Sequence, residues 1–234
     1  MSGGTGLRER KKQQTYRAIS DAAIALFLEK GFEAVSVAEI AAAADVSKPT
    51  LFRYFPAKED LALHRFADHE DEAARVVAAR EPGVSALDAL LEHFLDGLDR
   101  GDPVTGLSDV PQVLAFHRLL YGTPSLVARL YAYQARSEEA LAAALDGGEP
   151  RAGVADGVGA PVAARLAAGQ IIAVIRILAE ENWRRIAAGE SAEDVRPSAV
   201  DAARLAFAQL RNGLGQVGQV GQIGQAEQTG RPPE

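Results

Sequence analysis

Three aromatic and three basic side chains alternate within one short stretch of the sequence. In VSKPTLFRYFPAKEDL, residues 46–61, the aromatic residues Phe52, Tyr54 and Phe55 are interleaved with Lys48, Arg53 and Lys58. A fully buried helix would exclude the cations, and a fully solvated helix would exclude the aromatic rings. A short helix that is buried on one side and lies against phosphate on the other would use both. The stretch therefore indicates contact with a nucleic acid.

Two short helices are predicted to position these side chains. Ser36 and Glu39 have the spacing of a capping box, which opens a helix over residues 37–44. Ser47 then caps a second helix over residues 48–55, which a proline ends. Two short helices joined by about three residues are typical of a helix-turn-helix motif.

The second helix is predicted to have a buried face and an exposed face. The residues predicted to point inward are Leu51, Phe52 and Phe55, and those predicted to point outward are Thr50, Arg53 and Tyr54. Lys48 and Pro49 fall in the first turn, where backbone N–H groups without an intrahelical partner are free to meet a phosphate. The outward side chains could then enter a groove of a DNA duplex.

The charge distribution fits this interpretation. The 234-residue chain has a net charge of −7, but residues 1–58 hold nine basic and six acidic side chains, a net charge of +3. All five lysines lie in that segment, and the rest of the chain carries a net charge of −10. A basic segment on an acidic body is typical of a nucleic-acid-binding protein with a second domain. An ordinary basic tail around Lys11 and Lys12 would give a similar asymmetry.

The remainder of the chain is predicted to be helical. Further helices are predicted over residues 9–30, 58–80, 85–100, 110–121, 124–144, 161–188 and 197–212. Apolar residues recur there at helical spacing, and no segment alternates with the period of a strand. We therefore predict an all-α fold, with a three-helix helix-turn-helix domain over residues 9–57 and a larger helical domain over residues 58–213. Residues 1–8 and the Gly/Gln-rich residues 214–234 are predicted to be disordered tails.

Residues 17–61 resemble the DNA-binding domain of the TetR family of bacterial transcriptional regulators. The features that carry the resemblance are an Ala-rich first helix ending in Leu-Phe and then Gly-Phe, a Ser-Val-x-x-Ile-Ala helix, VSKPTLFRYF and KEDL. Asp45 stands where the family usually has Gly in the turn, and Asp tolerates the left-handed conformation better than most residues.

The resemblance implies a homodimeric repressor that binds a palindromic operator and is released by a small-molecule effector. The implied DNA contacts are Ser36, Val37, Ser47, Lys48, Pro49, Thr50, Arg53, Tyr54 and Lys58. Arg53 is expected to contact a base, whereas Tyr54 and Lys58 are expected to contact phosphates. The dimer is expected to form through the last two long helices, residues 161–188 and 197–212.

The larger domain gives fewer indications about the effector. The candidate ligand-binding residues are Phe94, Phe116, His117, Leu120, Tyr131 and Arg176. Core packing explains most of them equally well, and Arg176 could instead pair with Glu180 or cross the dimer interface. A faint resemblance of the C-terminal half to family members that sense acyl-CoA-type ligands suggests an apolar or anionic effector.

Other classes of function find little support in the sequence. There is no cysteine, no G-x-S-x-G or P-loop motif, and the four histidines have no spacing typical of a metal site. An enzyme, a metal site and a cofactor are therefore not expected. We expect no apolar run in the chain to be long enough to span a bilayer. We therefore predict a cytoplasmic protein without a membrane partner. The alternatives left open are a transcriptional activator and a helix-turn-helix protein that binds another protein without an effector.

Overall fold

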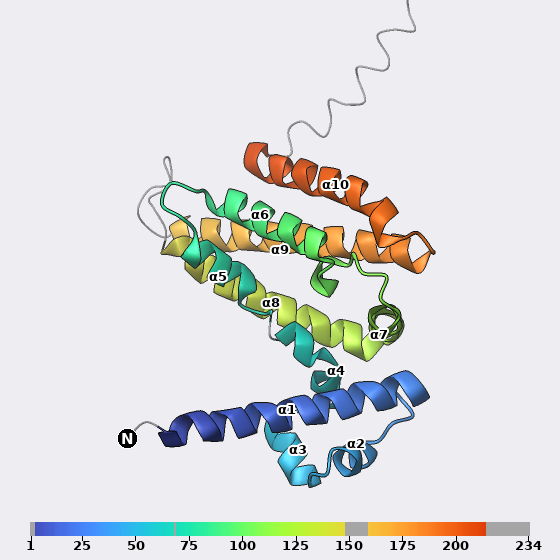
Figure 1. The fold of residues 1–234 in the computed structure, drawn as a ribbon. Helices are drawn as coiled ribbons and strands as arrows, with labels where there is room; N and C mark the ends of the chain where they lie inside the picture. Colours follow the sequence, from blue (N-terminus) through green and yellow to red (C-terminus); the bar gives the residue numbers. More distant parts are fainter. Residues whose placement is uncertain (1–2, 68, 148–158, 214–234) are drawn as a thin grey trace, which may run out of the picture. The chain divides into compact units, whose positions relative to one another are not determined.

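All regular secondary structure in the part of the chain that the structure describes is helical. The computed structural model describes residues 3–67, 69–147 and 159–213 (Figure 1). Its elements are α1 (Gly3–Lys30), α2 (Val37–Ala43), α3 (Lys48–Tyr54), α4 (Lys58–Ala67), α5 (Glu72–Ala79), α6 (Ala86–Arg100), the 3-10 helix η1 (Pro103–Thr105), α7 (Pro111–Gly122), α8 (Pro124–Asp146), α9 (Gly159–Ala187) and α10 (Ala192–Asn212). No strand occurs within these ranges, and the predicted all-α fold is confirmed.

Local signals set the ends of the first three helices, as predicted. The Ser36 hydroxyl accepts a hydrogen bond from the backbone N–H of Glu39, and the Glu39 carboxylate accepts one from Ser36 N–H at 2.8 Å. Ser47 caps α3 through its side chain. Gly31, with φ of +86°, follows the end of α1, and Asp45 adopts the left-handed conformation in the turn with φ of +51°. Each of these features joins groups that are close in the sequence.

The helix predicted over residues 58–80 is interrupted, contrary to the prediction. Between α4 and α5 the backbone N–H of His69 donates to the carbonyl of Phe66, and that of Glu72 donates to the carbonyl of His69. The His69 ring also contacts the Glu72 carboxylate at 2.6 Å. These turn contacts replace the hydrogen bonds of a continuous α-helix. The segment is rich in carboxylates, and like charges one turn apart destabilise a helix.

Two further helix starts differ from the prediction. α1 begins at Gly3, within the segment predicted to be a tail, because the good helix formers of residues 7–14 extend the helix toward the N-terminus. α10 begins at Ala192 rather than near Pro197, because Ser191 caps it by accepting from Asp194 N–H at 3.1 Å. The proline therefore lies inside the helix.

The chain forms two compact units. The first consists of Met1–Arg75 and Ser108–Ala144, and the second of Val76–Leu107 and Leu145–Glu234. The core of the first unit draws residues from α1 to α4 and from α7 and α8, among them Phe27, Ile40, Leu51, Phe55, Leu61, Leu120 and Leu126. Helices α7 and α8 share that core, although the sequence placed them in the larger domain over residues 58–213. The compact units therefore differ from the predicted domains, and the domain limits stay a prediction.

In the second unit α10 packs beside α6 and α9, and η1 packs against α9 (Figure 1). The Asn182 side-chain amide donates to the carbonyl of Thr105 at 2.9 Å, which ties η1 to α9. Gly106 follows η1 with φ of +74°, and a β-carbon added there would lie 1.9 Å from the carbonyl oxygen of Ala179. This contact requires glycine, both for its backbone conformation and for the space.

One segment of α9, Pro161–Ala187, is long and apolar enough to cross a bilayer by length and composition. This finding corrects the expectation that no segment of the chain is long enough. A single helix of this kind is weak evidence for a membrane span, because helices that pack in soluble proteins meet the same criteria. Here the helix packs against α10 and η1.

Candidate nucleic-acid interface

Helix α3 is held on the core of the first unit by its inner side. Leu51 and Phe55 are fully buried, and the Phe55 ring stacks on Tyr16 of α1 with 4.4 Å between ring centres. At the start of the helix, the Ser47 hydroxyl accepts from Thr50 N–H at 3.2 Å. Because the helix is fixed at both ends, its packing decides which side chains face solvent.

The exposed side of α3 carries Lys48, Pro49, Phe52 and Arg53, which we call the reading face. In the part of the chain that the structure describes, neither Lys48 nor Arg53 forms an ion pair. Phe52 is 47% exposed, so the prediction that it belongs to the core is wrong. It follows the buried Leu51, and one residue rotates the side chain by about 100° around a helix, which turns Phe52 away from the core.

Thr50 and Tyr54 do not lie on the reading face, although the sequence pattern placed them outward with Arg53. Both are half-buried. The Thr50 hydroxyl lies 2.8 Å from the Ser47 hydroxyl, and the Tyr54 ring lies 6.1 Å from that of Tyr16. Contacts of these two residues with DNA stay a prediction, and they would have to come from the edge of the helix.

Lys58 is engaged inside the first unit. Its ammonium donates to the carbonyl of Phe32 at 2.5 Å and lies 4.3 Å from the centre of the Phe32 ring. These contacts tie the start of α4 to the segment between α1 and α2. The predicted phosphate contact of Lys58 would have to compete with them.

Ser36 and Val37 open α2 rather than α3. Ser36 is exposed, but its backbone N–H already donates to Glu39, and that bond lowers the pKa of the Glu39 carboxyl. Val37 is half-buried. Their predicted phosphate contacts are therefore separate from the reading face and are untested.

A buried carboxylate next to the motif was missed by sequence reasoning. Asp60, in the first turn of α4, is 5% exposed and accepts four hydrogen bonds. The Arg129 guanidinium donates two, at 2.7 and 3.0 Å, and the Tyr133 hydroxyl and Ala57 N–H donate the others. Arg129, Tyr133 and Arg136 share one side of α8 by their spacing, but nothing local in the sequence identifies Asp60 as their partner.

The donors around Asp60 keep their protons at neutral pH. Burial, with the nearby Asp60 charge, raises the pKa of Tyr133 to about 12. The hydrogen bond to Asp60 raises the pKa of Arg129. The network of these donors with Asp60 fixes the start of α4 to α8 within the first unit.

The candidate ligand-binding residues belong to two compact units, and their meeting in one site stays a prediction. Phe116, His117, Leu120 and Tyr131 belong to the first unit, whereas Phe94 and Arg176 belong to the second. Leu120 is a core residue and Tyr131 is exposed. Arg176 pairs with Glu180 at 3.1 Å, which was one of its predicted alternatives.

His117 is buried on α7, and burial lowers its pKa to about 4. The imidazole is therefore neutral at neutral pH and supplies no positive charge for an anionic ligand. Its ring lies 6.3 Å from that of Phe116 and 6.2 Å from that of Tyr121, as expected for a core histidine.

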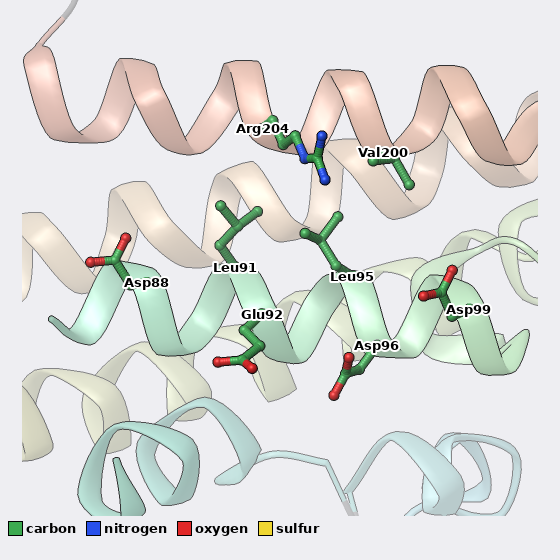
Figure 2. Close-up of a pocket in the computed structure, with 8 residues that line it drawn as sticks. All are labelled: Asp88, Leu91, Glu92, Leu95, Asp96, Asp99, Val200 and Arg204. Atoms are coloured by element: carbon green, nitrogen blue, oxygen red, sulfur yellow. The ribbon is translucent and has the colours of Figure 1, made fainter. Parts of the chain in front are cut away.

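A groove between α6 and α10 of the second unit involves none of the candidate ligand residues. It is lined by Asp88, Leu91, Glu92, Leu95, Asp96, Asp99, Val200 and Arg204. Figure 2 shows Leu91 and Leu95 pointing from α6 toward α10, whereas Glu92 and Asp96 point away from it. With four carboxylates and one guanidinium along it, the groove does not suit an anionic effector.

Comparison with known proteins gives the family of the motif. A sequence profile described as "Bacterial regulatory proteins, tetR family" matches residues 19–64, which span the C-terminal part of α1, all of α2 and α3, and most of α4. The chain is 34% identical over 138 residues to the HTH-type transcriptional regulator TcmR of Streptomyces glaucescens, covering 58% of this chain and 59% of TcmR. Residues 19–64 are therefore similar to the bacterial regulatory proteins of the TetR family.

Other TetR-family relatives are similar over a smaller part of the chain. The HTH-type transcriptional repressor KstR of Rhodococcus jostii is 31% identical over 105 residues, covering 44% of this chain and 49% of KstR. The chain thus spans about half the length of the curated relatives it matches. Both of these relatives, TcmR and KstR, are named as transcriptional regulators.

Solved structures support the all-helical fold of the described residues. NalD, described as the secondary repressor of the MexAB-OprM multidrug efflux pump in Pseudomonas aeruginosa, aligns with a TM-score of 0.51 at 17% identity, covering 84% of this chain and 97% of NalD. Salmonella enterica GusR aligns with a TM-score of 0.50 at 22% identity, covering 85% and 96%. At these identities the likeness concerns the fold alone.

Proposed function

We propose that this protein is a cytoplasmic transcriptional repressor of the TetR family that binds duplex DNA through α3. The observation that carries the proposal is the reading face, where Lys48 and Arg53 are exposed on a helix that is fixed by the Ser47 cap and the buried Leu51 and Phe55. A rigid helix with exposed cations suits the major groove, where arginine reads guanine and lysine neutralises phosphate. A gel shift against the DNA flanking the protein's own gene tests it.

Arg53→Ala is expected to weaken binding to the operator by about 1–3 kcal/mol, with a smaller loss on random DNA, because a base contact carries sequence information. Arg118→Ala is the matched control, since Arg118 is an exposed arginine on α7 of the same unit. Titrations of both variants against operator and random duplexes measure the effect. Equal losses on the two duplexes would remove the base-contact role of Arg53.

We further propose that the operator is palindromic and that two copies of the chain bind it, paired through α9 and α10. Val162, Leu166 and Ile177 are exposed and fall on one side of α9 by their helical spacing, and Leu205 of α10 is 62% exposed. A stripe of apolar side chains on the outside of two packed helices favours a second copy as its cover.

Leu166→Glu is expected to weaken the dimer by tenfold or more, because burying one leucine contributes about 1.5–3 kcal/mol and a symmetric interface contains two copies. Sedimentation equilibrium measures the dissociation constant. Leu28→Glu, at an exposed leucine of α1, is the control and should leave it unchanged. A wild-type chain that is monomeric at all concentrations would rule out this interface.

We propose that a small-molecule effector releases the DNA, on the basis of the family relationship. The effector is proposed to be apolar or anionic, but no set of residues is assigned to it because the candidates are divided between the two units. A ligand acts as an effector only if it binds the DNA-free state more tightly than the DNA-bound state. Release of a labelled operator on addition of fatty acyl-CoA tests the class of compound.

A further inference from the structure

An apolar patch lies in the middle of the reading face of α3. Phe52 is about half-exposed, and Pro49, three residues earlier, is exposed on the same side of the helix. Lys48 and Arg53 flank these two residues along the face. The two cations can contact anionic groups of a partner, while the aromatic ring between them can contact an apolar group of the same partner.

The core of the first unit does not account for the position of Phe52. Leu51 and Phe55 fill the inner side of α3, and Val46 and Tyr54 are among the partly buried residues that pack against this core. Phe52 is absent from that cluster. Its ring is therefore available to a partner that docks on the reading face.

The major groove of DNA offers one apolar feature that matches the patch. Thymine presents its 5-methyl group there, beside hydrogen-bonding base edges and between the phosphates of the two strands. We propose that Phe52 is a specificity-determining residue whose ring packs on the 5-methyl group of a pyrimidine in each half-site. This proposal rests on the proposed function, since it requires that α3 enters the major groove.

Replacement of single thymines by deoxyuridine tests the contact, because it removes only the methyl group. On the operator defined by gel shift, the wild-type protein is expected to lose about fourfold in affinity when one particular thymine of a half-site becomes deoxyuridine. For Phe52→Ala the affinities for the thymine and deoxyuridine duplexes are expected to become equal at that position. Leu28→Ala, at an exposed leucine of α1, is the control and should keep the wild-type profile.

A second set of duplexes separates the methyl group from the base that carries it. Cytosine or 5-methylcytosine replaces the sensitive thymine, with guanine opposite. The wild-type protein is expected to bind the methylated duplex more tightly than the unmethylated one, and Phe52→Ala is expected to bind both alike. Equal binding of the two by the wild-type protein would contradict the proposed contact with the 5-methyl group of a pyrimidine.

The results distinguish this proposal from the proposed function. If the wild-type protein binds the operator but no thymine is sensitive to loss of its methyl group, the Phe52 proposal is wrong and DNA binding stands. The same follows if Phe52→Ala keeps the sensitivity of the wild-type protein. If the wild-type protein binds no duplex, the proposed function itself fails. Because Phe52 is exposed, the variant should fold, and its unfolding temperature provides the check.

Discussion

Arg129→Met is expected to lower the free energy of unfolding by about 3 kcal/mol, because it leaves the buried Asp60 carboxylate without its cation. The Asp60 side chain is 7% exposed, and both of its oxygens accept from the Arg129 guanidinium. Breaking a buried pair by removing one partner typically costs about 3–5 kcal/mol, and we take the lower end because the Arg129 side chain is itself 37% exposed. Urea unfolding measures the change.

Arg75→Met provides the matched control for this prediction. Arg75 pairs with Asp71 at 3.0 Å, but both side chains are about 60% exposed, so the loss should stay below about 1 kcal/mol. The double variant Asp60→Asn with Arg129→Met should recover part of the stability, since it removes the unpaired charge. Equal losses in Arg129→Met and Arg75→Met would contradict the inferred importance of the network.

The network also bears on DNA binding. Asp60 accepts from Ala57 N–H, only three residues after the end of α3, so Arg129 on α8 acts on the segment that follows the reading face. If α8 moves in response to an effector, this contact passes the movement directly to α4. We therefore expect Arg129→Met to lower operator affinity although Arg129 lies outside the reading face.

Gly106→Ala is expected to destabilise the second unit by about 3–5 kcal/mol, through a left-handed backbone that disfavours alanine and through overpacking against α9. The added β-carbon would lie 1.9 Å from the carbonyl oxygen of Ala179 and 3.1 Å from the backbone nitrogen of Trp183. Neither atom belongs to a flexible side chain, so α9 and η1 would have to separate. Thermal or urea unfolding monitored by Trp183 fluorescence measures the loss.

Gly83→Ala separates the effect of the left-handed backbone from the effect of overpacking against α9. Gly83 also has a positive φ, +86°, and belongs to the same unit, but a β-carbon there meets nothing within 4 Å. Its substitution should cost only the backbone term, about 1–2 kcal/mol. If the two variants lost the same stability, close packing of Gly106 on α9 would not be the reason for the glycine.

Short-range features of this protein could be predicted from the sequence. The capping box of Ser36 and Glu39, the Ser47 cap and the left-handed Asp45 were all expected, and all are present. Their interacting groups lie within a few residues of one another, so the chemistry of a short segment is enough to define them. The same local pattern carried the resemblance to the TetR family.

Features that depend on distant parts of the chain were missed or misplaced. Phe52 was assigned to the core, and the contact of Lys58 with the carbonyl of Phe32, which lies 26 residues away in the sequence, was not foreseen. The Asp60–Arg129 pair joins residues 69 positions apart. The sequence by itself determined where α2 and α3 begin and that the chain is helical. Only the tertiary structure decided which side of α3 faces solvent and which charges are buried, because burial depends on the neighbours that folding brings together.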